Sequence, residues 1–143
     1  MAAGQYVDRA SGSAGRTVVA ARDAPAAGAP LGRNEVLLVG RVSAVPEDRE
    51  LPSGDLLTTW RLVIDRTPPR RPAPEGVRLP TVDTVSCVAW TSRLRRTASG
   101  FTPGDVVEVT GALRQRYWRA GAGLASRTEV EVLSARRLAR APG

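Results

Sequence analysis

One short stretch of the chain, "GALRQRYWRAGAG", combines flat rings with fixed positive charge. It places the adjacent aromatic residues Tyr117 and Trp118 among Arg114, Arg116 and Arg119, in a chain whose aromatic content is 4%. An aromatic ring offers a stacking surface, and a planar guanidinium can bind a phosphate with two parallel hydrogen bonds. The stretch therefore indicates a ligand that carries both planar groups and anions.

Strand alternation divides this stretch between two faces. The predicted strand over 105–118 has one apolar set, Val107, Val109, Gly111 and Leu113, which we assign to the core. The other set is Glu108, Thr110, Ala112, Arg114, Arg116 and Trp118. Alternate residues of a strand lie about 7 Å apart on one face, so Arg114, Arg116 and Trp118 should project in a row. Tyr117 has the core-facing parity, and we expect it at the rim of the core.

An exposed row of this kind suits single-stranded nucleic acid, because unpaired bases stack on aromatic rings and the phosphates between them require cations. Trp118 could instead pack against the adjoining loop or a subunit interface, and Trp90 could stack on a base or cap the fold. Trp60 alternates with Leu62 and Ile64, which predicts a core position. The candidate binding residues are Trp90, Trp118, Arg61, Arg70, Arg71, Arg114, Arg116 and Arg119.

The charge balance also favours a polyanionic partner. All 21 basic residues are arginine, and 14 acidic residues leave a formal net charge of +7 over 143 residues. Arginine keeps its charge when partly buried and grips phosphate, although genomic base composition is an equal explanation for the missing lysine. The position of the arginines needs a separate reason.

The composition argues against an enzyme. Cys87 is the single cysteine and histidine is absent, which excludes disulfide frameworks, zinc sites and histidine-based catalysis within the chain. The carboxylates form no recognisable catalytic pair or metal-binding spacing. We expect no cofactor and no metal, with Cys87 as a small buried residue. The sequence shows neither a signal peptide nor an apolar run that would span a bilayer, so we expect a cytoplasmic protein with no membrane partner.

The elements that must position these residues are short β-branched runs separated by Pro, Gly and Asp. Five strands are predicted, over 34–45, 56–66, 82–90, 105–118 and 127–138. A turn is predicted over 46–55, a proline-rich exposed loop over 67–81, a short helix within 91–101 capped by Thr91 or Ser92, and a flexible tip over 119–126.

This order predicts an all-β fold, a five-stranded Greek-key barrel of the OB type with one short helix between strands 3 and 4. Residues 1–33 are rich in Ala and Gly, and we predict a disordered or loosely attached leader there. The barrel domain should occupy 34–138, followed by a short basic tail over 139–143.

An ordered set of segments resembles the bacterial single-stranded DNA-binding protein family. The segments are "NEVLLVGRV", "PEDRELPSG", "CVAWTSRL", "GDVVEVTGALRQRYW" and "TEVEV", and they span about 34–138. The resemblance implies an OB-fold that binds single-stranded DNA without strong sequence preference, in replication, repair or recombination, and assembles as a homotetramer. The family's base-stacking aromatic positions map onto Trp90 and Trp118.

Two departures from the family pattern are visible in the sequence. Two further aromatic positions of the family are not kept, since Thr84 occupies one and the region of Pro68 the other. The sequence ends in "SARRLARAPG", where the family commonly has a long tail with an acidic tip that recruits partners. These departures favour a specialised paralogue. The alternatives are an OB-fold assembly subunit whose arginine-rich face binds an acidic protein tail, and a single-stranded RNA binder.

Overall fold

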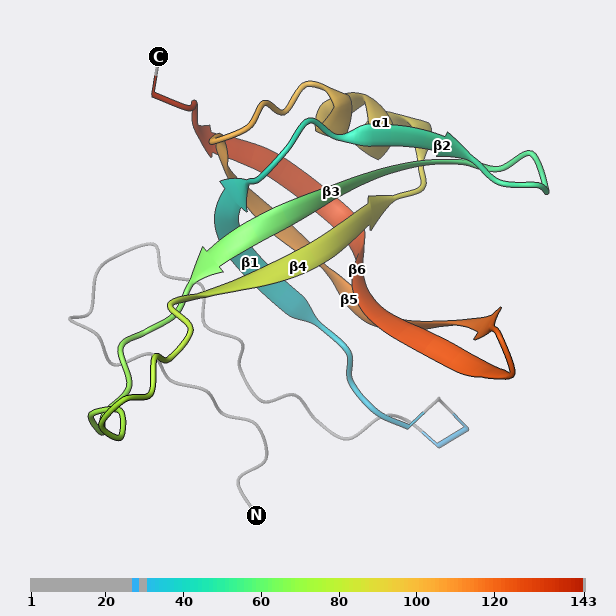
Figure 1. Cartoon of the computed structure of the whole chain (residues 1–143). Helices are drawn as coiled ribbons and strands as arrows, with labels where there is room; N and C mark the ends of the chain where they lie inside the picture. Colours follow the sequence, from blue (N-terminus) through green and yellow to red (C-terminus); the bar gives the residue numbers. More distant parts are fainter. Residues whose placement is uncertain (1–26, 29–30, 143) are drawn as a thin grey trace. The chain divides into compact units, whose positions relative to one another are not determined.

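The computed structural model describes residues 27–28 and 31–142, and it consists of strands with one short helix (Figure 1). The elements are β1 (Val36–Val42), β2 (Glu47–Glu50), β3 (Leu56–Asp65), β4 (Val82–Ala89), α1 (Ser92–Ser99), β5 (Val106–Ala120) and β6 (Gly123–Ala139). The leader predicted over 1–33 falls mostly outside the described residues and stays a prediction. Residues 34–143 group as one unit of the chain.

The six strands form one sheet that bends back on itself. Its order is β1-β5-β6-β4-β3-β2, and β1 makes a further pairing with β3 at Arg41–Val63 and Val42–Leu62. Every pairing is antiparallel except that of β4 with β6. The pairings therefore run in a closed circuit through β1, β5, β6, β4 and β3. Gly40 permits the close approach of β1 to β3, because a Cβ there would lie 2.7 Å from the carbonyl oxygen of Val63.

The prediction of five strands was wrong because a short strand lies inside the segment expected to be a turn. Strand β2 pairs with the first half of β3, from Glu47–Thr59 to Glu50–Leu56. All four of its side chains are exposed, and three of them are acidic. An exposed edge strand buries no apolar face, so it lacks the hydrophobic alternation by which strands are recognised in sequence.

The tip predicted between the last two strands was also wrong. Strand β5 continues to Ala120 and β6 begins at Gly123, so the hairpin turns through two residues, with Gly121 at a φ of +59°. A two-residue turn of this kind requires positive φ and thus favours glycine. The long hairpin extends away from the rest of the sheet (Figure 1).

The core lies inside the circuit of strands. Trp60 and Cys87 are buried as predicted, with exposed fractions of 4% and 0%. The Trp60 ring meets Phe101 edge to face, with centroids 5.8 Å apart. Burial raises the pKa of the Cys87 thiol to about 12, so the thiol is inert at neutral pH. Further core side chains come from β1, β3, β5 and β6: Val42, Leu62, Val107, Val109, Val130 and Val132.

Helix α1 covers one end of this core through Ala98, which is fully buried. Thr91 is its N-cap, as one of the two predicted candidates, and its hydroxyl oxygen accepts a hydrogen bond from the Leu94 amide at 3.2 Å. At the other end the Gly100 amide donates to the Thr97 carbonyl at 3.1 Å. The helix therefore fixes the direction in which the chain leaves β4.

Candidate nucleic-acid interface

Arg114, Arg116 and Trp118 lie on one face of β5, because the strand alternates regularly along the hairpin. Their cross-strand partners on β6 are Glu129, Arg127 and Ala125, respectively. Residues directly opposite each other in an antiparallel pair project to the same side. The predicted row is thus a two-strand surface, to which β6 contributes both a carboxylate and another arginine.

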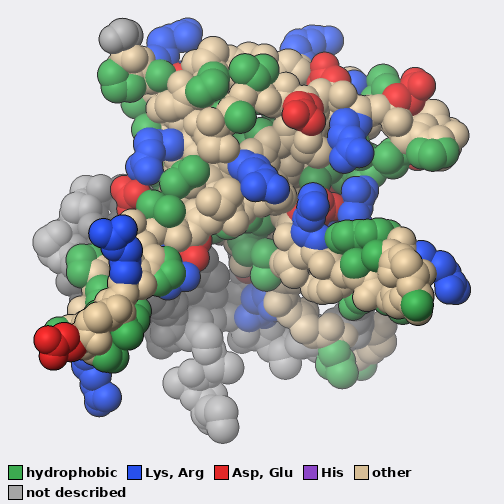
Figure 2. Space-filling model, viewed as in Figure 1, with side chains coloured by type: hydrophobic (Ala, Val, Ile, Leu, Met, Phe, Trp, Pro, Cys, Tyr) green, Lys and Arg blue, Asp and Glu red, His purple; other side chains and the backbone are tan. Residues whose placement is uncertain are grey.

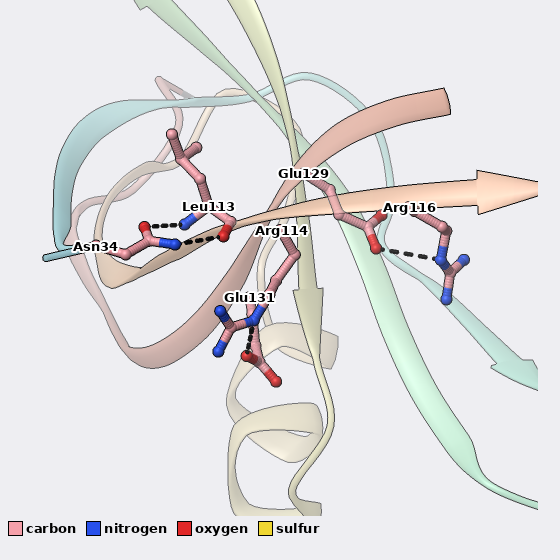
Figure 3. Close-up of polar contacts among 6 residues, drawn as sticks. All are labelled: Asn34, Leu113, Arg114, Arg116, Glu129 and Glu131. Atoms are coloured by element: carbon pink, nitrogen blue, oxygen red, sulfur yellow. Dashed lines mark hydrogen bonds and ion pairs between the residues drawn. The ribbon is translucent and has the colours of Figure 1, made fainter. Parts of the chain in front are cut away.

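Carboxylates partly neutralise this surface. Arg114 Nε donates to Glu131 Oε1 at 2.8 Å, and Arg116 Nε lies 3.4 Å from Glu129 Oε1 (Figure 3). In the first pair the Arg114 side chain is 57% exposed. In the second pair the carboxylate residue, Glu129, is only 8% exposed. An exposed pair is weak and can open toward a ligand, while a buried carboxylate stays in place. The sequence pattern alone did not predict this balancing charge.

A groove of about 300 Å³ lies between the hairpin and the outer face of β3 and β4. Its charged lining residues are Arg49, Arg61, Arg116, Arg127, Glu47 and Glu129, so four positive and two negative side chains leave an excess of two positive charges. Figure 2 shows arginine side chains gathered around this hollow, between the β2–β3 end and the β5–β6 hairpin. Two of the predicted residues, Arg61 and Arg116, are brought together here from distant parts of the sequence.

Trp118 presents an exposed ring near this groove. Its exposed fraction is 42%, which is high for tryptophan. The guanidinium carbon of Arg127 lies over the ring, 5.8 Å from its centroid, in the range of a cation–π contact. Because Arg127 also lines the groove, it connects the indole to the arginine cluster.

Trp90 lies directly after β4 and is half-buried. It alternates with Ser86 and Val88, which line the groove, so its position is on the same side of the sheet. Its carbonyl oxygen accepts a hydrogen bond from Arg95 Nε at 3.2 Å, which ties it to α1. Trp90 itself is not part of the groove lining, and its role stays a prediction.

The remaining predicted residues lie elsewhere. Arg70 and Arg71 are exposed in the loop between β3 and β4 and do not line the groove. The base of that loop is held by Arg66 and Asp83, whose side chains make two hydrogen bonds of 2.7 and 3.0 Å. The hydrogen bond from Arg66 lowers the pKa of Asp83. Arg119 is exposed on the opposite side of β5 from Trp118.

The other face of the hairpin corrects two predictions. Leu113 is 45% exposed and Tyr117 is 66% exposed, although alternation assigned Leu113 to the core and Tyr117 to its rim. The pairing of β1 with β5 ends at Val36–Gly111, and no β5 side chain from Leu113 to Ala120 is buried. The side-chain amide of Asn34 replaces the missing strand, accepting from the Leu113 amide at 2.8 Å and donating to its carbonyl at 2.7 Å (Figure 3).

Sequence reasoning missed Arg49, Arg127 and Glu129. Arg49 belongs to the unrecognised strand β2, and Arg127 was counted only as the start of the last predicted strand. The two-residue turn at Gly121 would have been the useful signal, because it sets the register that places Arg127 opposite Arg116.

No group of three or more His, Cys, Asp or Glu side chains among the described residues is arranged to hold a metal ion. In the same part of the chain, no helix has both the length and the apolar character of a membrane span.

The fold and this surface define a small β protein with a basic groove beside an exposed aromatic residue. Residues 33–138 match the model of the single-strand binding protein family. This match covers most of the sequence, and the chain belongs to that family, as the resemblance of its segments predicted.

Two relatives show how far the similarity extends. The chain is 32% identical over 90 residues to a single-stranded DNA-binding protein of Thermotoga maritima, which covers 63% of this chain and 62% of that protein. It is 32% identical over 85 residues to single-stranded DNA-binding protein A of Bacillus subtilis, which covers 59% of this chain and 46% of that protein. The matched region thus spans roughly half to three fifths of these relatives.

A solved structure described as "Plasmodium falciparum SSB complex with ssDNA" has a similar fold. Its TM-score is 0.63 at 21% sequence identity, and the match covers 77% of this chain and 98% of that one. At this identity the similarity concerns the arrangement of strands and helix. It supports the closed circuit of pairings described above.

Proposed function

We propose that this protein binds single-stranded DNA without sequence preference and acts by binding alone, without catalysing a reaction. The fold that serves this function is a five-stranded OB-type barrel made of β1, β3, β4, β5 and β6, with β2 added at its edge. The proposal places the protein in the cytoplasm, on DNA exposed during replication, repair or recombination. Its membership of the single-strand binding protein family supports this assignment.

The groove beside Trp118 is the observation that carries the proposal. It joins arginines from four strands to one exposed indole. A base stacked on an aromatic side chain contributes about 1 to 3 kcal/mol, whereas an exposed charge pair contributes about 0 to 1 kcal/mol. Stacking on Trp118 and Trp90 should therefore supply most of the short-range affinity, and the arginines should supply the dependence on salt.

Titration with oligo-dT tests the proposal directly. Bound bases should quench tryptophan fluorescence, and log affinity should fall linearly with log salt by about 0.7 for each phosphate neutralised. The absence of both quenching and gel retardation at low salt would contradict single-stranded DNA binding.

Competition experiments separate the alternatives, since a basic groove also suits other polyanions. Oligo-U that displaces oligo-dT with equal or higher affinity would favour an RNA partner. An acidic peptide that is retained by the protein and is not displaced by oligo-dT would favour a protein-assembly role. We expect oligo-dT to bind more tightly than oligo-U and to displace the acidic peptide.

The outer surface supports a homotetramer, the assembly implied by the family resemblance. Three large apolar side chains on β1 and β6 are exposed, namely Val39 at 45%, Leu133 at 68% and Leu138 at 45%. Two of them lie where the β5–β6 register shifts, which turns side chains outward. Burying such side chains between copies is favourable. Light scattering should give the mass of four chains, and a monomer mass at micromolar concentration would contradict the assembly.

A further inference from the structure

Arg127 occupies the point where the indole and the groove meet. Its guanidinium lies over one face of Trp118, and the same side chain lines the groove together with Arg61 and Arg116. A planar guanidinium can stack on a ring and donate hydrogen bonds in its own plane at the same time. One side chain can therefore act on both the base and the phosphate of a bound nucleotide.

Arg127 also stands directly opposite Arg116 across the hairpin. Like charges at opposed positions destabilise a strand pair unless a counter-charge is present. Glu129 provides it, since it is 8% exposed, lines the same groove and lies 3.4 Å from Arg116 Nε. Glu129 pairs with Arg116, so Arg127 adds to the groove a positive charge that a ligand anion can match.

The setting of Trp118 explains why such a contact matters. The ring lies on the part of the hairpin beyond the β1 pairing, where no β5 side chain from Leu113 to Ala120 is buried. A side chain without packing samples several rotamers, and selecting one of them on binding costs conformational entropy. A guanidinium held over one face by a cation–π contact favours one rotamer before the ligand arrives and leaves the other face for a base.

We propose that Arg127 is a positioning residue with two roles: it holds Trp118 for base stacking, and together with Arg116 it forms a binding site for one phosphodiester group of a single-stranded nucleic acid. This inference rests on the proposed function and specifies where the base and the phosphate of a bound nucleotide lie. The base stacks on the open face of Trp118, and a neighbouring phosphate lies between the two arginines.

A double-mutant cycle separates the two roles. In the full chain, Arg127→Lys keeps the charge but removes the planar guanidinium that lies over the ring, so it should weaken oligo-dT binding about two- to fivefold when Trp118 is present. The same change made together with Trp118→Ala should have no further effect. Arg127→Gln should in addition lower the salt slope by about 0.7, which Arg127→Lys should not.

A measurement without ligand keeps the test independent of DNA binding. The emission of Trp118, taken as the difference between chains with and without Trp118→Phe, should become more accessible to acrylamide in Arg127→Lys. Arg93→Lys makes the same change on the exposed surface of α1, outside the groove lining, and should leave Trp118 accessibility unchanged. Circular dichroism melting should show equal midpoints for all these variants.

The outcomes distinguish the two proposals. If wild-type protein binds oligo-dT but Arg127→Lys weakens binding equally with and without Trp118, the positioning role is wrong while the function stands. Unchanged acrylamide accessibility in Arg127→Lys also overturns the positioning role. If wild-type protein does not bind oligo-dT at all, the function fails and the phosphate site fails with it, whatever the accessibility shows.

Discussion

The two ends of the β5–β6 strand pair use arginine and carboxylate for opposite purposes. Near the start of β5, Asp105 is fully buried and Arg137 Nε donates to it at 2.9 Å. Toward the tip, Arg116 and Glu129 form a looser pair of 3.4 Å whose arginine remains accessible in a groove. The first pair belongs to the architecture of the fold, and the second belongs to the proposed binding surface.

The difference arises from how many donors surround each carboxylate. Asp105 also accepts hydrogen bonds from the backbone amides of Thr102 and Ala141, both at 2.8 Å. The backbone hydrogen bond from Thr102, followed by that from Ala141 and the contact with Arg137, holds the pKa of Asp105 well below its ordinary range. Glu129 has no comparable set among the described residues, so its arginine can exchange it for a ligand anion. Several elements of this fold converge on the charge of Asp105, which makes its ion pair structural, whereas none of the described elements converges in this way on Glu129.

Replacing Asp105 should have the largest effect, and it should fall on stability. Asp105→Asn removes the charge on which Arg137, Thr102 and the chain after β6 converge, so thermal unfolding followed by circular dichroism should begin at a clearly lower temperature. The remaining folded protein should bind oligo-dT as the wild type does. An unchanged midpoint would show that the two ends of the hairpin do not differ in this way.

Acid should reveal the same residue in the wild-type protein. The folded-state pKa of Asp105 is lowered from 3.8, so its contribution to stability is complete above that pH and is lost as the pH falls below it toward the folded-state pKa. Urea unfolding between pH 5 and pH 2 should show a decline in stability, and Asp105→Asn should show a shallower one. Equal slopes would contradict the assignment.

Trp118→Ala should have the next largest effect, and it should fall on binding. Loss of one stacked base corresponds to about 1 to 3 kcal/mol, or roughly a 5- to 150-fold weaker affinity for oligo-dT. The ring is exposed and makes no core contact, so the unfolding midpoint should not move. Tyr117→Ala, on the opposite face, is the matched control, and an equal loss there would remove the distinction between the two faces.

Arg116→Gln should produce a smaller loss of affinity that depends on salt. One fewer phosphate contact lowers the slope of log affinity against log salt by about 0.7, with the difference from wild type vanishing at high salt. Fluorescence titrations at several salt concentrations would measure it. A loss that is independent of salt would indicate that Arg116 supports the hairpin and does not contact phosphate.

Arg136→Gln should have the smallest effect on either property. Arg136 Nε donates to Glu108 at 3.0 Å, but the arginine side chain is 70% exposed and lies on the outer face, away from the groove. Such pairs contribute about 0 to 1 kcal/mol, so both the unfolding midpoint and the salt slope should match wild type within error. A clear change in the salt slope would extend the binding surface beyond the groove.

Local pattern predicted the parts of the molecule that depend on local physics. The alternation of β5 correctly placed Arg114, Arg116 and Trp118 on one face, and the apolar spacing around Trp60 correctly predicted its burial. The prediction failed for β2, whose exposed side chains lack hydrophobic alternation, and for Leu113, which is exposed despite its core-facing parity. Whether a strand residue is covered depends on which other strand lies over it, and the sequence of one strand does not contain that information.

By itself, the sequence determined the family, the order of the main strands, the helix cap at Thr91 and the faces of the arginine row, because each of these follows from residue type and short-range spacing. Only the tertiary structure decided that Arg49, Arg61, Arg116 and Arg127 meet in one groove and that Glu129 is buried among them. These arginines lie on four different strands, and the register that brings them together is set by a two-residue turn, a bulge and the closing contact at Gly40. Charges that are distant in sequence become neighbours only when such long-range pairings are complete.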